Sequence, residues 1–131
     1  MEPITNYIAL WRQLVEARKD PHAPEPTTIN AGDSDAWRDR ARLFHQRVLE
    51  RWSRPDSSRD FVCSQVMGNT TVLDIGAGTG SWSLLLARKA AHVTAVDPSP
   101  AMLSVLEENL AEAGLKNVSV VLGGWPEAEV E

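Results

Sequence analysis

Three glycines alternate with other residues over positions 76–80, directly after the run Val72–Ile75, which is apolar except for Asp74. Asp97 ends the next apolar run, seventeen residues after the last of these glycines. When a glycine loop follows a strand, a ligand can approach the backbone, and an acid that ends the next strand can accept hydrogen bonds from the hydroxyl groups of a ribose. The residue types and their spacing therefore predict a nucleotide-binding site.

Each glycine of this loop has its own expected role. Gly76 permits the sharp turn out of the strand, Gly78 lets the ligand approach the backbone, and Gly80 lets the following helix pack tightly on the strand. Ala77 stands between the first two glycines and belongs to the same loop. The free N–H groups at the beginning of the helix expected over 81–89 also face the ligand.

Two simpler explanations remain open. The glycines could form a turn that binds nothing, although three glycines within five residues cost backbone entropy unless a positive φ or a close approach requires them. Asp97 begins the segment Asp97–Pro100, which could merely turn the chain and cap the next helix. An apolar strand, a glycine loop, an amphipathic helix and a second strand that ends in an acid together favour the ligand site.

The spacing of the glycines also distinguishes between two ligands. A dinucleotide site expects Gly-x-Gly-x-x-Gly, with a pyrophosphate at the helix N-terminus. In this chain the third glycine comes one residue earlier, and Asp74 lies two residues before the first glycine. A carboxylate so close to the loop is unfavourable beside a pyrophosphate, but it suits a ligand that carries an ammonium or sulfonium charge.

Residues 72–80, Val-Leu-Asp-Ile-Gly-Ala-Gly-Thr-Gly, closely resemble the first motif of class I S-adenosylmethionine-dependent methyltransferases, and Val93–Leu103 resembles their second motif. The resemblance implies that the glycine loop wraps the methionine part of S-adenosylmethionine and that Asp97 binds the ribose hydroxyl groups. It also implies that Pro98 and Met102 pack against the adenine. Met102 could equally be a core-facing residue of its helix.

The resemblance covers roughly residues 70–126 and departs from the family pattern after the third strand. The family usually has an Asp there that holds the adenine amino group, whereas this chain has Gly124. The backbone N–H of Trp125 could meet an adenine nitrogen, and Glu127 could replace the acid, although Trp125 could also simply anchor the strand end. The expected cofactor-binding residues are Asp74, Gly76, Ala77, Gly78, Gly80, Asp97, Pro98, Met102, Gly124 and Trp125.

Strands and helices alternate after Gly68, which implies parallel pairing through right-handed crossovers. The expected fold is α/β, a partial Rossmann-like (doubly wound) β-α-β-α-β unit with three parallel strands, preceded by an α-helical N-terminal arm. Its expected strands are Thr71–Ile75, His92–Val96 and Asn117–Leu122, and its expected helices are 81–89 and Pro100–Ala113.

Apolar residues recur at helical spacing ahead of this unit. They predict a helix over 4–18, which the prolines of segment 20–26 end, and a second helix that starts near Asp33–Ser34. Asp56 or Ser57 can cap a third helix. The expected division is therefore a helical arm over 1–67, which the resemblance implies is a lid, and a truncated S-adenosylmethionine-binding half over 68–131.

The composition restricts the class of protein. At 131 residues the chain is one domain's worth of material, and a net charge of −5 argues against a general nucleic-acid binder. The single cysteine excludes an internal disulfide framework, the histidines have no metal-ligand spacing, and no metal is expected. No signal peptide or membrane span is present in the sequence, so a cytoplasmic location is expected.

The sequence therefore predicts the N-terminal, cofactor-binding portion of a methyltransferase that acts on a small molecule rather than on nucleic acid. The family's substrate-binding residues follow a fourth strand, so no catalytic residue is nominated and the chain alone is expected to be inactive. An uncovered strand edge at 71–75 predicts self-association. Two alternatives stay open: a non-catalytic S-adenosylmethionine-binding module, and the dinucleotide-binding half of an oxidoreductase.

Overall fold

The computed structural model describes residues 6–17 and 35–130, and the chain divides into two compact units, 1–33 and 34–131. The first unit contains helix α1, Tyr7–Ala17. This helix begins where the side chain of Asn6 accepts a hydrogen bond from the backbone N–H of Ala9 at 3.0 Å. The expected helix is thus confirmed over the described residues, whereas Ile4 and the proline-rich segment 20–26 lie outside them.

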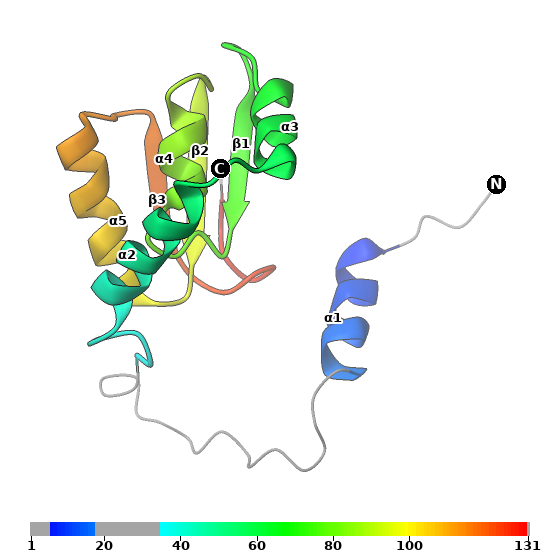
Figure 1. The fold of residues 1–131 in the computed structure, drawn as a ribbon. Helices are drawn as coiled ribbons and strands as arrows, with labels where there is room; N and C mark the ends of the chain where they lie inside the picture. Colours follow the sequence, from blue (N-terminus) through cyan, green and yellow to red (C-terminus); the bar gives the residue numbers. More distant parts are fainter. Residues whose placement is uncertain (1–5, 18–34, 131) are drawn as a thin grey trace. The chain divides into compact units, whose positions relative to one another are not determined.

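The second unit is built on a parallel sheet of three strands in the order β1-β2-β3 (Figure 1). Its register places Leu73 beside Thr94, and Thr94 beside Ser119. The expected parallel α/β fold is therefore confirmed. The elements of this unit are α2 (Ala41–Trp52), α3 (Ser57–Gln65), β1 (Thr71–Ile75), α4 (Ser81–Ala87), β2 (His92–Asp97), α5 (Pro100–Ala113) and β3 (Val118–Leu122).

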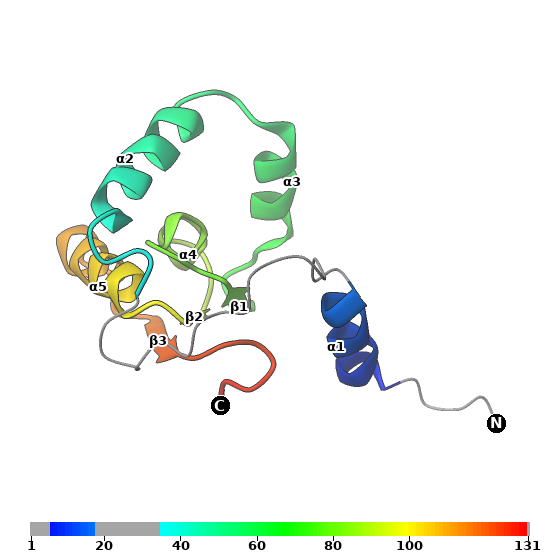
Figure 2. The ribbon, with the colours of Figure 1, turned by 90° about the horizontal axis from the view of Figure 1, so that it is seen from below.

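The helices of this unit cover one face of the sheet, and residues 123–130 run along the other side (Figure 2). Alternate strand residues point toward the helices, as the period of two along a strand requires. Val93 and Ala95 of β2 are fully buried beneath α4 and α5 and belong to two adjoining core clusters. On the opposite face, Leu73 and Ile75 of β1 remain 41% and 48% exposed.

Helix α5 shows both of the expected end signals. The hydroxyl of Ser99 accepts a hydrogen bond from the backbone N–H of Met102 at 3.1 Å, Pro100 stands in the first turn, and Gly114 follows the last turn. Because α5 begins immediately after β2, these caps fix the helix start close to the carboxyl end of the sheet. Helix α3 is capped as expected by Asp56.

The start of α2 differs from the expectation. The helix begins at Ala41, and residues 36–40 form turns, whereas Asp33 and Ser34 lie outside the described residues. The carboxylate of Asp35 accepts a hydrogen bond from the N–H of Trp37 at 3.0 Å. It also accepts one from the N–H of Ala101 at 2.6 Å, so this acid is held at the N-terminus of α5 instead of at the N-terminus of α2.

Candidate functional site

The glycine loop joins β1 to α4 in a left-handed conformation. Gly76, Gly78 and Gly80 have φ angles of +72°, +57° and +87°, which residues with a side chain rarely adopt. The backbone N–H groups of Gly76 and Ala77 both donate to the carbonyl of Val96, at 2.8 and 2.9 Å. The loop is therefore fastened to the end of β2, where a ribose-binding acid was expected.

Gly80 is required by packing as well as by its φ angle. A Cβ atom at this position would overlap the side chain of Leu106, which lies in the middle of α5 and is fully buried. The sequence predicted that this glycine lets the following helix pack tightly on the strand, whereas the neighbour that excludes a Cβ in the structure is Leu106 of α5. At Gly78, in contrast, a Cβ would lie 3.8 Å from Phe44 and 3.9 Å from Met102, so its φ angle is the constraint.

Asp97 lies directly against the glycine loop. It is 9% exposed, and its two carboxylate oxygens accept hydrogen bonds from the N–H of Gly78 at 2.9 Å and from the N–H of Ser99 at 2.8 Å. An ionised carboxylate offers about four lone-pair sites, so two acceptor positions remain for hydroxyl groups. The two backbone donors fix the orientation in which these positions are presented.

Asp74 is the second acid of the site. It points to the helix side of β1 and accepts a hydrogen bond from the hydroxyl of Ser83 at 2.6 Å. Burial raises the pKa of the Asp74 carboxyl, the hydrogen bonds from Ser83 oppose this rise, and the negative charge of Asp97 adds to it. A cation placed near both acids would relieve this repulsion.

Two of the expected adenine contacts have very different surroundings. Pro98 is exposed at the carboxyl end of β2. Met102 is 3% exposed and packs with Ala41 and Val105 between α5 and α2. This burial agrees with the core-facing alternative for Met102, while its sulfur also approaches the loop at Gly78.

The segment after β3 continues along the carboxyl edge of the sheet. The N–H of Gly123 donates to the backbone carbonyl of Asp97 at 3.0 Å, which brings this segment to the site. Gly124 is exposed and its carbonyl accepts a hydrogen bond from Ala128 at 2.8 Å, whereas Trp125 is half-buried. The structure thus brings the candidate residues of the three strand ends to one edge.

Asp35 is a neighbour of the site that sequence reasoning missed. The hydroxyl of Ser99 donates to both of its carboxylate oxygens, at 2.8 and 2.9 Å, across 64 positions of the chain. Partial burial tends to raise the pKa of Asp35, but the hydrogen bonds from Ala101, Trp37 and Ser99 and the charge of Arg38 lower it overall. No local sequence pattern marks this contact, because Asp35 and Ser99 are far apart in the sequence.

A second missed feature is a polar network behind the loop. Nδ1 of His45 lies 2.9 Å from the hydroxyl of Thr79, and its Nε2 lies 3.3 Å from the amide nitrogen of Asn109. The same amide nitrogen donates to the carbonyl of Thr79 at 3.1 Å. His45 was noticed in the sequence only for its lack of metal-ligand spacing, since its partners come from two other elements.

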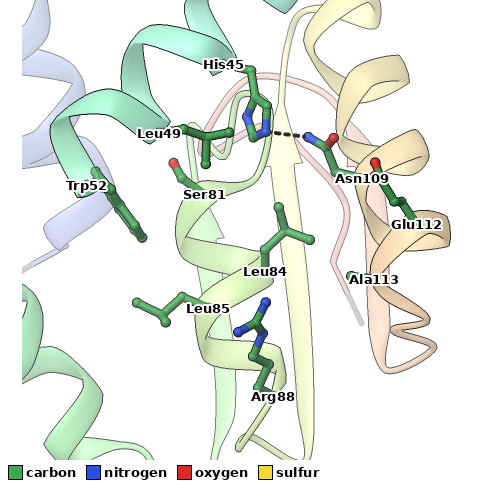
Figure 3. A pocket seen from close by; sticks show the side chains of 10 residues that line it. All are labelled: His45, Leu49, Trp52, Ser81, Leu84, Leu85, Arg88, Asn109, Glu112 and Ala113. Carbon is green, nitrogen blue, oxygen red and sulfur yellow. Dashed lines mark hydrogen bonds between the residues drawn. The ribbon is translucent and has the colours of Figure 1, made fainter.

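The network borders a cavity of about 290 Å³ between α2, α4 and α5 (Figure 3). Apolar side chains including Leu49 and Leu84 line it, together with Arg88 and Glu112. No group of three or more potential metal ligands occurs among the described residues, and none of the helices described is long and apolar enough to cross a membrane.

Comparisons with known proteins show which proteins this unit resembles. Residues 72–130 match the model of a family described as "Methyltransferase domain". The demethylmenaquinone methyltransferase of Listeria monocytogenes is 40% identical over 62 residues, which cover 45% of this chain and 26% of that protein. The matched segment thus spans about a quarter of the length of this curated relative.

Two solved structures share the fold. A Streptococcus mutans protein, described as a methyltransferase in complex with SAH, has a TM-score of 0.50 and 30% identity over 51% of this chain and 38% of its own. An rRNA methylase from Streptococcus thermophilus has a TM-score of 0.50 and 27% identity, and the match covers 51% of this chain and 40% of that one.

The second of these structures corrects the expectation about the substrate. The net charge predicted a small-molecule acceptor and no nucleic acid, but an rRNA methylase shares the fold and over a quarter of the aligned residues. Net charge is a sum over the whole chain, whereas α2 alone carries Arg42, Arg47 and Arg51 against the single acid Glu50. An acidic total therefore does not exclude a nucleic-acid substrate.

The family expectation itself is confirmed. Motif, fold and family match all fall on the same stretch of chain, and S-adenosylmethionine is the cofactor to which they point. Residues 72–130 thus match a methyltransferase domain family and are similar to the class I S-adenosylmethionine-dependent methyltransferases.

Proposed function

We propose that residues 68–131 bind S-adenosylmethionine at the carboxyl edge of β1 and β2, as the cofactor-binding half of a methyltransferase. The observation that carries this proposal is the position of Asp97, whose carboxylate is oriented by Gly78 and Ser99 with acceptor sites to spare. These sites suit the paired hydroxyl groups of a ribose. Pro98, Gly124 and Trp125 lie at the same edge and are proposed to border the adenine.

The residues of this site favour a positively charged ligand. Asp74 and Asp97 place two carboxyl groups at neighbouring strand ends, and the negative charge of Asp97 adds to the rise in the pKa of Asp74 that burial causes. When bound, S-adenosylmethionine supplies a sulfonium-activated methyl group for transfer to a nucleophile. The contribution of this chain is to hold the cofactor in a fixed orientation, which lowers the entropic part of the barrier to transfer.

Calorimetric titration with S-adenosylhomocysteine and with NAD tests the proposal. We expect binding of S-adenosylhomocysteine, and binding of NAD alone would overturn the assignment. Asp97→Asn should weaken S-adenosylhomocysteine binding by about tenfold to a hundredfold, the loss expected for a hydrogen bond to a charged acceptor. Asp60→Asn, an exposed acid on α3, serves as the matched control. Equal affinities of the two variants would contradict the ribose contact.

A further inference from the structure

His45 lies where α2, the glycine loop and α5 meet (Figure 3). Its two ring nitrogens face different partners, the hydroxyl of Thr79 and the side-chain amide of Asn109. Thr79 is 1% exposed and stands between Gly78 and Gly80, both of which are left-handed. The ring of His45 therefore contacts the buried residue between the last two glycines of the loop.

The hydrogen bonds determine where the proton on the ring must be. The amide nitrogen of Asn109 donates to the backbone carbonyl of Thr79, and a carbonyl can only accept. The same amide nitrogen faces Nε2 of His45, so Nε2 must be the acceptor and carries no proton. Neutral His45 then has its proton on Nδ1, from which it donates to the hydroxyl of Thr79.

We propose that His45 is a positioning residue of the cofactor site, which in its neutral form holds Thr79 and the glycine loop in the shape that binds the cofactor and releases them on protonation. This inference rests on the proposed function, in which S-adenosylmethionine is the ligand of the loop. It assigns to α2, which lies outside the residues of the family match, an effect on cofactor affinity that acts through Thr79 and the loop.

Protonation is incompatible with the network as it stands. A proton on Nε2 would point at the N–H of Asn109, so that two donors would face each other. Rotating the amide of Asn109 would offer its oxygen to the imidazolium, but it would remove the donor from the carbonyl of Thr79. The first arrangement sets two donors of His45 and Asn109 against each other, and the second removes the hydrogen bond from Asn109 to Thr79, so either one weakens the network that holds the loop.

The charges around the ring do not override this preference. Glu112 of α5 and Arg88 of α4 line the same cavity as His45, and Arg42 on α2 is paired with Glu108 of α5 at 2.7 Å. Burial lowers the pKa of His45, and the charge of Glu112 opposes this effect only in part. The neutral ring is thus the dominant form at neutral pH, and the loop is released only when acid protonates His45.

The first test follows the histidine by NMR in the 131-residue chain without cofactor. Acid titration should move the ring resonances of His45 and the backbone amides of Gly78 and Gly80 with the same midpoint. Asn109→Asp should raise that midpoint, because a carboxylate accepts from the protonated ring but cannot donate to Thr79. His92→Asn, at the other end of β2, is the control and should leave the coupled titration intact. A midpoint that Asn109→Asp does not raise would overturn the proposal.

The second test measures S-adenosylhomocysteine affinity between about pH 7.5 and about pH 5, across the range in which histidine titrates. The unaltered chain and His92→Asn should lose about two- to tenfold more affinity over this interval than His45→Asn, since asparagine can donate to Thr79 and has no titrating proton. An equal loss in His45→Asn would overturn the proposal.

The two tests also separate this inference from the proposed function. If the chain binds no S-adenosylhomocysteine at any pH, the proposed cofactor is wrong. The NMR titration then decides the role of His45 alone: independent titration of the ring and of the loop amides would refute a hold on the loop, and joint titration would support it.

Discussion

The carboxylate of Asp97 accepts a hydrogen bond of 2.9 Å from the backbone N–H of Gly78, nineteen positions earlier in the chain. This bond joins the end of β2 to the loop that follows β1, so the two sequence motifs of the site meet through one contact. A substitution at either residue should therefore change the position of the other, and substitutions at the residues that pack against them should also disturb the site.

Gly80→Ala should destabilise the fold strongly. Its Cβ would overlap Leu106, and its φ angle of +87° disfavours any side chain. Strain and overpacking together predict a loss of roughly 2–5 kcal/mol in the free energy of unfolding. Urea denaturation measures this loss, with Gly68→Ala as the control because a Cβ there meets nothing within 4 Å. In the background Leu106→Ala the cost of Gly80→Ala should shrink, and strict additivity would argue against the clash.

Asp35→Asn should weaken the attachment of the segment before α2 to the N-terminus of α5. The folded-state pKa of Asp35 lies below the ordinary value of 3.8, so its carboxylate stabilises the fold at neutral pH, and this contribution is lost as the pH falls through the folded-state pKa. We expect a loss of about 0.3–1 kcal/mol at neutral pH, the usual contribution of a negative charge beside a helix N-terminus.

Thermal unfolding at several pH values measures the Asp35 effect. The difference between the unaltered chain and Asp35→Asn should be largest near neutrality and should vanish in strong acid. A pH-independent difference would show that the negative charge is not what holds Ser99 and Ala101.

Asp74→Asn should raise stability and lower cofactor affinity. The pKa of Asp74 is raised in the folded state, so folding is penalised once the pH is high enough to ionise this carboxyl. Removing the charge therefore raises the midpoint of thermal unfolding at neutral pH, while it also removes the attraction for a sulfonium. Asp60→Asn should change neither quantity, and a variant of Asp74 that gains stability without losing affinity would contradict its role in binding.

The features that the sequence predicted are those with local signals. Strand β1 and helix α5 were predicted at their observed bounds, because an apolar run bounded by turn residues marks the first, and Pro100 with Gly114 marks the ends of the second. The loop and Asp97 follow from the spacing of glycines and acid around two strands. Such patterns lie within about thirty residues of sequence, the length of a single β-α-β unit.

The features that were missed depend on contacts between distant segments. Asp35 reaches Ser99, and His45 reaches Asn109, each across 64 positions. Neither pair has a sequence pattern of its own, because hydrogen-bond partners on separate helices are set by how the helices pack. The start of α2 at Ala41 was missed for the same reason, since Asp35 is engaged by α5 and does not cap α2.

The carbonyl of Val96 receives two loop N–H groups, and Asp97 beside it receives a third. These three bonds all come from the chain itself and hold the loop against the end of β2. A preorganised loop loses little conformational freedom on binding, so more of the contact energy is available as affinity. The backbone amide hydrogens of the loop should accordingly exchange slowly with solvent even in the chain without cofactor, because slow exchange is expected of a rigid loop and fast exchange of a mobile one.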